Sequence, residues 1–210
     1  MRFLGFGFTL LLVLSCVGAG AATLEAKVEQ DRIAVLVDGE VFTAYLFGND
    51  LKKPYLYPVT GPLSGKSVTV ESQADQYPHH NSLWFGCDHV NGGNYWQDTN
   101  ERGQILSEGA KVVSSGKDKV VIEDTCLWKQ PEQAAVIRDR RTITVSAPKA
   151  GLRIIDFEIE LEPMTEVTIQ KTNHSLFSGR MRPELGVKQG GTLVNAQGNS
   201  AEAGTFGVAS

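Results

Sequence analysis

Long apolar segments, basic clusters and cysteines are scarce in this sequence of 210 residues. Beyond one run near the N-terminus, no stretch approaches the ~20 apolar residues of a membrane-spanning helix, so the mature chain should have no transmembrane segment. The formal net charge is −4 and no basic patch is visible, which argues against a nucleic-acid partner. Cys87 and Cys126 are the only cysteines beyond the first 22 residues. In an exported chain such a pair is either joined in a disulfide or present as two buried free thiols, and the spacing does not distinguish the two.

Common catalytic signatures are also missing. The Gly-x-Ser-x-Gly element of serine hydrolases does not occur, and neither of these two cysteines lies in a recognisable catalytic context. No glycine-rich loop suited to cradling a phosphate is present. The sequence therefore gives little support to a nucleophilic triad or to a phosphate-binding loop.

The first 22 residues have the composition of a secretory signal peptide. Arg2 precedes the apolar run Phe3–Val13, which is too short to span a bilayer, and small residues follow it. Cleavage after Ala21 or Ala22, with export to the periplasm or the medium, is expected. The alternative is a lipoprotein signal, in which Cys16 is acylated.

From Thr23 onward, apolar and polar residues alternate with period two, and helical periodicity is almost absent. For example, Ile33, Val35 and Val37 alternate before Asp38-Gly39, a hairpin-type turn. The pattern predicts one all-β domain over residues 23–210, an antiparallel two-sheet β-sandwich. Strands are expected at residues 33–37, 41–47, 54–58, 67–71, 104–114, 119–129, 134–145, 152–161 and 166–172.

Two of these strands carry informative patterns. The strand over 134–145 contains four consecutive charges, Arg138 to Arg141, and some of them must face the interior of a sandwich, where they need partners. In the strand over 152–161 one face is wholly apolar and is predicted to be buried. That face consists of Ile155, Phe157, Ile159 and Leu161.

Residue types suited to binding or catalysis are concentrated in the stretch Tyr77–Trp96. It contains three of the four histidines and two of the three tryptophans. Leu83–Phe85 favours a strand, Asn91–Asn94 favours a tight turn, and Tyr95-Trp96 favours a second strand. Histidines should therefore lie at the entrance of a strand and near a turn.

These residue types suit a site that binds or transforms a saccharide. Such a site needs aromatic rings for stacking, polar groups for hydroxyls, and an acid–base pair. His79 or His80, together with Asp139, is the predicted acid–base set. The predicted substrate-binding residues are Trp84, Asn91, Trp96, Lys171, His174 and Arg180. Core packing is the alternative reading for the tryptophans.

A metal site is the second reading of the histidines. His79 and His80 would point to opposite faces of a regular strand, but in a loop after Pro78 they could converge, with His89 as a further ligand. Copper, iron or zinc would suit such a set. The spacing matches no established ligand motif, so no metal cofactor is predicted.

Several motifs resemble those of a family of exported bacterial proteins labelled "methane oxygenase PmoA". The resemblance extends over most of the chain beyond the N-terminal run. It rests on Lys53–Pro58, Pro78–Phe85, Val90–Gly92, Trp96, Asp139-Arg140, Asp156, Lys171-Thr172, Leu176-Phe177 and Arg180-Met181.

The resemblance implies a β-sandwich protein of carbohydrate metabolism, similar to the galactose-mutarotase sandwiches. The label itself implies a metal-dependent oxygenase, and a non-catalytic binding module is a third possibility. Members commonly have histidines where this chain has Tyr77 and Cys87, and they commonly continue beyond Ser210. A C-terminally truncated sandwich is therefore expected.

Overall fold

The computed structural model describes residues 22–71, 77–97, 99–172, 174–205 and 207. Cys16 and all but the last residue of the predicted signal peptide, residues 1–22, lie outside the described residues. The described chain forms two antiparallel sheets with almost no helix, as predicted for a β-sandwich. No helix within these ranges is long and apolar enough to cross a membrane.

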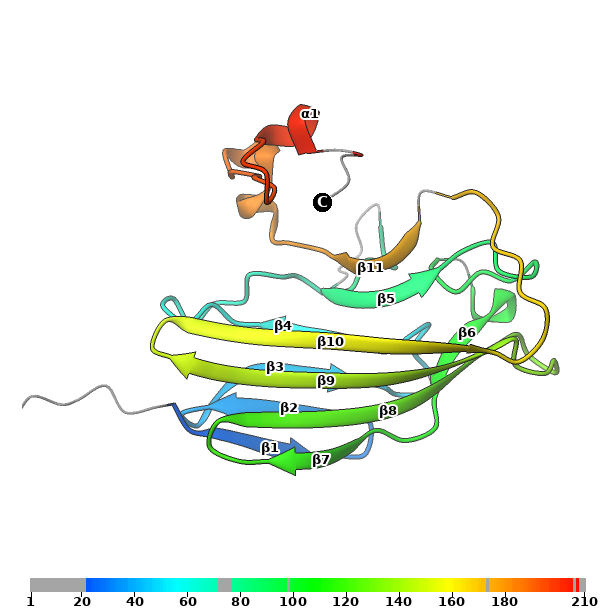
Figure 1. Cartoon of the computed structure of the whole chain (residues 1–210), viewed down its shortest axis with the longest axis horizontal. Coiled ribbons are helices and arrows are strands. Elements are labelled where there is room, and N and C mark those ends of the chain that lie inside the picture. The colour runs from blue at the N-terminus through cyan, green and yellow to red at the C-terminus, as the bar shows by residue number, and fades with distance from the viewer. Residues whose placement is uncertain (1–21, 72–76, 98, 173, 206, 208–210) are drawn as a thin grey trace, which may run out of the picture.

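The larger sheet has six strands in the order β1-β2-β3-β4-β5-β11. Their bounds are β1 Leu24–Val28, β2 Arg32–Val37, β3 Glu40–Leu46, β4 Tyr55–Val59, β5 Leu83–Cys87 and β11 Ser175–Gly179. Figure 1 shows this sheet stacked on the second one, with the segment that follows β11 lying beyond its outer side.

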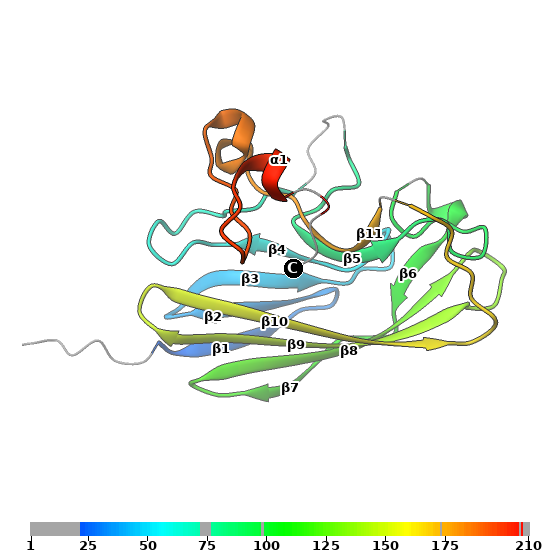
Figure 2. The same cartoon turned by 45° about the horizontal axis from the view of Figure 1, so that its top comes forward.

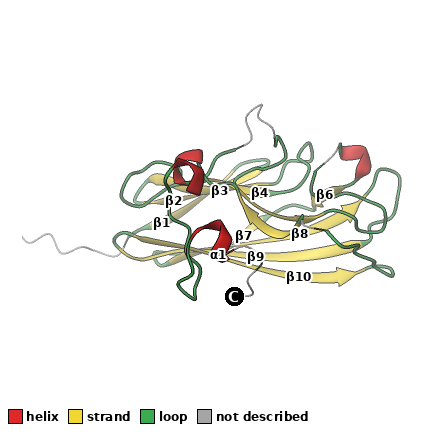
Figure 3. Ribbon diagram, turned by 90° about the horizontal axis from the view of Figure 1, so that it is seen from above, coloured by secondary structure: helices red, strands yellow, loops and turns green. Residues whose placement is uncertain are grey.

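The smaller sheet has the order β10-β9-β8-β6, and β7 also pairs with β8. Its strands are β6 Gln104–Ser107, β7 Lys111–Ser115, β8 Lys119–Lys129, β9 Ile137–Lys149 and β10 Leu152–Pro163. The long β8, β9 and β10 form one continuous layer (Figure 2). Short 3-10 turns at Asn100–Arg102, Pro183–Leu185 and Val187–Gln189 and the helix α1, Ala201–Thr205, lie outside the two sheets (Figure 3).

Alternation along the strands produces the core between the sheets. Side chains of β2, including Ile33 and Val35, pack against Ile122 and Ile143 of the opposite sheet. A second cluster joins Phe85 of β5 to strands β6, β8 and β9. The β2–β3 hairpin turns where predicted, because Asp38 and Gly39 adopt the positive φ values that this turn needs.

Some predicted strands differ from the structure. The segment 104–114 is two strands, β6 and β7, separated at Glu108-Gly109, where Gly109 has a φ of 118°. Ser67–Glu71 makes isolated bridges only, and Tyr95-Trp96 forms no strand. The predicted strand Glu166–Thr172 is wrong as well, since only Ile169 makes a bridge there, to Val90. The last strand is β11.

The predicted inner face of β10 is correct in part. Ile155, Phe157 and Ile159 pack against the inter-sheet core. Leu161 is 39% exposed instead, near the end of the strand. Period two fixes which face a residue points to, but the extent of the opposite sheet decides whether that face is covered.

The charged strand β9 places two of its four charges in the interior, with partners, as predicted. Asp139 and Arg141 are fully buried, and two nitrogens of Arg141 donate to the carboxylate of Asp139 at 2.8 and 2.9 Å. Trp128 also donates its indole N–H to Asp139. This carboxylate thus belongs to the inter-sheet core and does not lie with His79 and His80, which precede β5 on the other sheet.

Cys87 and Cys126 are both buried and carry free thiols, so the structure contains no disulfide between them. Both belong to the same inter-sheet cluster. Their sulfurs donate to separate oxygens, the backbone carbonyl of Asp88 and the carboxylate of Asp124. Burial raises the pKa of both thiols, which keeps them in the unreactive protonated form.

Candidate functional site

The outer face of β5 carries the aromatic residues of the candidate site. Leu83 and Phe85 pack into the inter-sheet core, so Trp84 between them points to the opposite face of the strand. There it forms a separate buried cluster with Tyr55 and Trp96. Trp84 and Trp96 are only 2% and 5% exposed, which leaves neither indole open to stack on a ligand in this structure.

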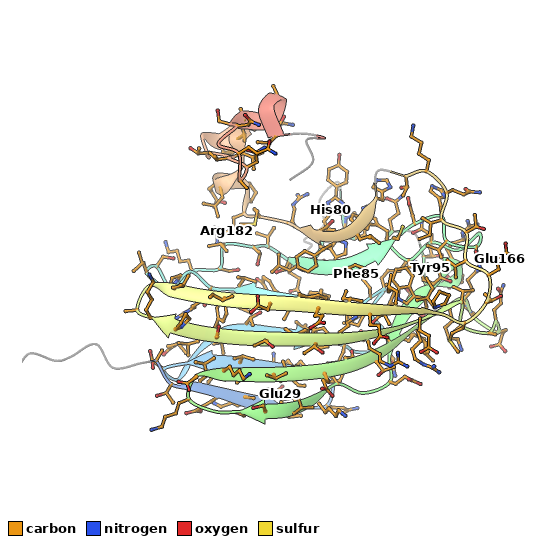
Figure 4. The ribbon with its side chains drawn as sticks, viewed as in Figure 1. Glu29, His80, Phe85, Tyr95, Glu166 and Arg182 are labelled. Atoms are coloured by element: carbon orange, nitrogen blue, oxygen red, sulfur yellow. The ribbon has the colours of Figure 1, made fainter. Side chains whose placement is uncertain are left out.

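Five rings follow one another across this outer face, and we call them the ring ladder: Tyr77, His80, Trp84, Trp96 and His174. Successive ring centroids are 5.0, 5.2, 5.2 and 5.7 Å apart. His80 lies between Tyr77 and Trp84, tilted by 8° and 24° from their planes. Figure 4 shows His80 on the outer side of β5 and Phe85 on its inner side. Tyr77 is exposed, His80 and His174 are half-buried, and the two indoles between them are buried.

Lys53 links two segments of the site by hydrogen bonds to their backbone. Its Nζ donates to the backbone carbonyl of His79 at 3.1 Å and to that of Trp96 at 2.8 Å. The same nitrogen lies 5.4 Å from the centroid of Trp84, a cation–π distance. Gly86 makes room for this arrangement, because a Cβ there would lie 3.2 Å from Cδ of Lys53 and 2.7 Å from a backbone oxygen.

The Lys53 ammonium is almost completely removed from water. Burial, followed by the charge of Lys52, lowers its pKa to about 7. The two carbonyl acceptors and the face of Trp84 act in the opposite direction, since each stabilises a positive charge. A buried lysine of this kind was not predicted from the sequence, because nothing in the local pattern marks Lys53 as internal.

Arg180 links the ring ladder to a polar pocket. Its guanidinium carbon lies 5.7 Å from the ring of Tyr77, and Nη1 lies 3.5 Å from Nδ1 of His80. The pocket has a volume of about 490 Å³ and lies between two segments that bridge at Thr69 and Met181. We call it the Arg180 pocket; its lining consists of Tyr57, Ser67, Thr69, Val70, Glu71, Arg180, Arg182, Pro183 and Glu184.

Both carboxylates in this pocket accept hydrogen bonds from side chains. Arg182 donates to Glu184 at 2.7 Å, and the hydroxyl of Tyr55 donates to Glu71. Burial, and next the hydrogen bond to Glu71, raise the pKa of Tyr55. The phenol therefore stays protonated and can keep donating to this carboxylate.

The other end of the ladder carries an imidazole–carboxylate pair. Nδ1 of His174 lies 2.8 Å from Oδ2 of Asp88, and the ring of His174 stacks on Trp96 at 30°. The side chain of Asp88 is 2% exposed, whereas that of His174 is 34% exposed. Nε2 of His89 approaches the same carboxylate oxygen at 3.5 Å.

Two predicted substrate-binding residues lie outside this arrangement. Asn91 uses both ends of its amide on the backbone, donating to the carbonyl of Glu166 and accepting from the N–H of Thr168, each at 2.8 Å. It therefore holds the connection between β10 and β11. Lys171 is exposed in that same connection.

The predicted metal candidates do not form one group. The rings of His79 and His80 meet edge to face, 4.4 Å apart, but His89 instead contacts Asp88. Among the described residues, no group of three or more His, Cys, Asp or Glu has the geometry to hold a metal ion. The histidines present therefore do not fit the three-histidine site considered from the sequence.

The sequence singled out His79, His80, His174 and Arg180 as candidates but did not indicate the residues that lie around them. Lys53, Tyr57 and Arg182 carried no local signal that separates them from ordinary strand and surface residues. Asp88 was visible beside His89, but its partner His174 lies 86 positions away. Only the pairing of β5 with β11 brings the two together, with Cys87 opposite Ser175.

Comparison with known proteins gives one match. The model described as "Family of unknown function (DUF6807)" matches residues 32–209. No curated protein and no solved structure matches the chain.

Proposed function

We propose that this chain, which belongs to the family of unknown function DUF6807, binds a saccharide in the Arg180 pocket. The observation that carries the proposal is the lining of this pocket. It combines two guanidinium groups, two carboxylates, two aliphatic hydroxyls and the phenol ring of Tyr57 within about 490 Å³. Pockets for small ligands have volumes of roughly 300–1,000 Å³ and need a few well-placed polar groups.

Saccharides suit this lining because their hydroxyls both donate and accept hydrogen bonds. Carboxylates such as Glu71 accept from hydroxyls, and guanidinium groups such as Arg180 donate to them. A sugar ring also has apolar C–H faces, for which Tyr57 offers an aromatic partner. The exposed ring of Tyr77 lies next to Arg180 and supplies a second partner.

Another pocket, of about 430 Å³, suits a sugar less well. It is lined by residues 30–31, 47–50 and 107–109. Its charged groups are all carboxylates, from Asp31, Asp50 and Glu108, and its single ring is Phe47. It thus offers a hydroxyl no cationic donor, and it contains none of the histidines.

The proposal also carries forward the expectations from the "methane oxygenase PmoA" resemblance. A protein of carbohydrate metabolism fits the Arg180 pocket, and export, with the signal in residues 1–22, would place it where it meets extracellular glycans. A metal-dependent oxygenase, which the label implies, is the second candidate and has less support, because no group of three or more His, Cys, Asp or Glu among the described residues has the geometry to hold a metal ion. Elemental analysis of the purified protein separates the two, since stoichiometric copper, iron or zinc would support the oxygenase.

The binding test uses the mature chain, a panel of mono- and oligosaccharides on an array, and calorimetry on the hits. The change Arg180→Gln should weaken binding by about tenfold or more, because a hydrogen bond from a charged group contributes about 1.5–3 kcal/mol. Arg140→Gln is the matched control, since Arg140 lies on the other sheet and pairs with Glu162. Absence of binding across the panel, or equal losses in the two variants, would refute the proposal.

A further inference from the structure

His174 and Asp88 have the geometry of an acid–base pair. The 2.8 Å contact joins Nδ1 of His174 to a carboxylate oxygen, so this ring nitrogen carries the hydrogen and the tautomer is fixed. Nε2 is then the nitrogen with the lone pair. It makes no hydrogen bond within the described part of the chain, and the side chain is one-third exposed.

The surroundings hold the imidazole in one orientation. Trp96 stacks on its ring, and the backbone N–H of His174 donates to the hydroxyl of Thr172 at 2.9 Å. The backbone N–H of Asp88 also faces the carbonyl of His174 at 3.4 Å. Both residues are thus fixed relative to each other by the backbone as well as by the side chains.

Asp88 has few other partners for its charge. Its Oδ1 is buried and makes no hydrogen bond among the described residues, and its Oδ2 contacts only the two imidazoles. A buried carboxylate with an imidazole as its main partner is suited to stabilise the imidazolium that forms when Nε2 takes up a proton. The Asp139–Arg141 pair differs, since there the positive charge is permanent.

We propose that His174 is the proton acceptor of this site and that Asp88 is its positioning residue. A ligand O–H bond breaks, its proton forms the Nε2–H bond, the electron pair stays on the oxygen, and Asp88 stabilises the imidazolium. The proton returns in the reverse step. The assignment rests on the proposed function only for the identity of the ligand, a saccharide on this outer face.

The ring ladder connects the Arg180 pocket with the His174–Asp88 pair by ring contacts. Its rings run in unbroken contact from Tyr77, beside Arg180, to His174. A saccharide that reaches both the Arg180 pocket and Nε2 must be larger than one sugar ring and must pass over Trp84 and Trp96, which are buried. The His174–Asp88 pair replaces the acid–base set expected from the sequence, in which Asp139 served His79 or His80.

The first test reads the tautomer of the wild-type chain by long-range 1H–15N NMR, with the signal assigned through His174→Gln. At about pH 8.5, well above the usual pKa of histidine, His174 should carry its hydrogen on Nδ1 and none on Nε2. In Asp88→Asn a substantial Nε2–H population should appear. A wild-type His174 with its hydrogen on Nε2 would overturn the inference without the need for any variant.

The second test measures carbethoxylation of each histidine by diethyl pyrocarbonate, followed by peptide mass spectrometry. Asp88→Asn should slow the reaction of His174 about tenfold or more, because loss of the carboxylate that orients an imidazole has effects of this size or larger. Glu162→Gln, a carboxylate-to-amide change on the other sheet, is the control and should leave the rate unchanged. Equal rates in wild type and Asp88→Asn, or equal effects of the two variants, would overturn the inference.

The same assay separates this inference from the proposed function. A panel saccharide that binds the wild type should protect His174. Binding that depends on Arg180 but leaves the His174 rate unchanged would refute the role of His174 and leave the binding function standing. If no saccharide binds but the tautomer and the carbethoxylation rates of His174 are as expected, a saccharide is refuted as the ligand and the acid–base pair is supported.

Discussion

At the scale of single residues, the interior of the sandwich depends on one buried ion pair. The Asp139 and Arg141 side chains are 0% exposed and meet through two hydrogen bonds. Asp139→Asn leaves the guanidinium without a balancing charge, and breaking a buried pair in this way costs about 3–5 kcal/mol. Urea denaturation should show this loss in the free energy of unfolding.

An exposed carboxylate on the same strands is the control for this prediction. Glu162 pairs with Arg138 and Arg140 on the surface, where removal of a partner costs at most about 1 kcal/mol. Glu162→Gln should therefore be nearly neutral. If Asp139→Asn keeps full stability but loses ligand turnover, Asp139 belongs to the chemistry and not to the core.

Lys53 makes stability depend on pH. Its pKa is about 7 in the folded chain and about 10.4 in the unfolded one. Below pH 7 both states hold the proton and the native state carries the full cost of a buried ammonium. Between the two values the unfolded chain binds a proton that the native chain releases, so the contribution of Lys53 to stability rises with pH.

The measurement compares wild type with Lys53→Met by urea denaturation across this range. The difference in unfolding free energy should shift in favour of the wild type by up to about 1.4 kcal/mol per pH unit. The comparison cancels the titration of all other groups. A difference that stays constant from neutral to alkaline pH would show that the two carbonyls and Trp84 keep Lys53 charged throughout.

The thiols give a third prediction at this scale. Cys87 and Cys126 are buried and free, and burial raises the pKa of both. Iodoacetamide should label neither in the native protein, and both should become labelled in urea without any reductant. Intact mass then reports two added groups. A denatured chain that takes up the label only after reduction would reveal a disulfide instead.

At the scale of elements, the turn after β5 fixes the connection that leads to β11. Asn91 has a φ of 49° and uses its amide on Glu166 and Thr168. Asn91→Gly permits the same backbone but removes both hydrogen bonds, each of which contributes about 1 kcal/mol. Amide hydrogen exchange at Thr168 should become faster.

A second variant separates the contributions of the two hydrogen bonds. Asn91→Asp keeps an acceptor for the N–H of Thr168 and loses only the donor to Glu166, so protection at Thr168 should remain.

The predicted strand Glu166–Thr172 is wrong for a related reason. Its apolar residues attach to β5 and its turn through single contacts, such as the Val90–Ile169 bridge, and do not form a ladder.

At the scale of the whole molecule, β11 is an end strand of the six-stranded sheet. Leu176 and Phe177 in this strand are exposed by 41% and 49%. An open strand edge with apolar side chains favours association, and a lysine on it opposes pairing. Leu176→Lys should therefore reduce concentration-dependent association in analytical ultracentrifugation.

Leu193→Lys is the matched control for the edge. Leu193 is similarly exposed, at 43%, but lies outside any strand. It should leave association unchanged. Monomeric behaviour of the wild type at all concentrations, or equal effects of the two lysines, would show that β11 is not an associating edge.

The sequence by itself determined the sandwich and singled out the loop before β5 as a candidate site. Alternation with period two acts over neighbouring residues, so β2, β3, β8 and most of β10 could be placed without any long-range information. The four charges in β9 required internal partners for the same local reason. The loop before β5 was recognisable from its unusual concentration of histidines and aromatic rings.

Tertiary structure alone decided which of these side chains work together. Asp139 was interpreted as a partner of the histidines, but it lies on the inner face of β9, where it pairs with Arg141 in the core. His174 meets Asp88 because β11 pairs with β5, and Lys53 becomes internal because Gly86 leaves space beside it. Such contacts join residues far apart in the chain. Their selection depends on strand order and on the space left by neighbours, which no local pattern encodes.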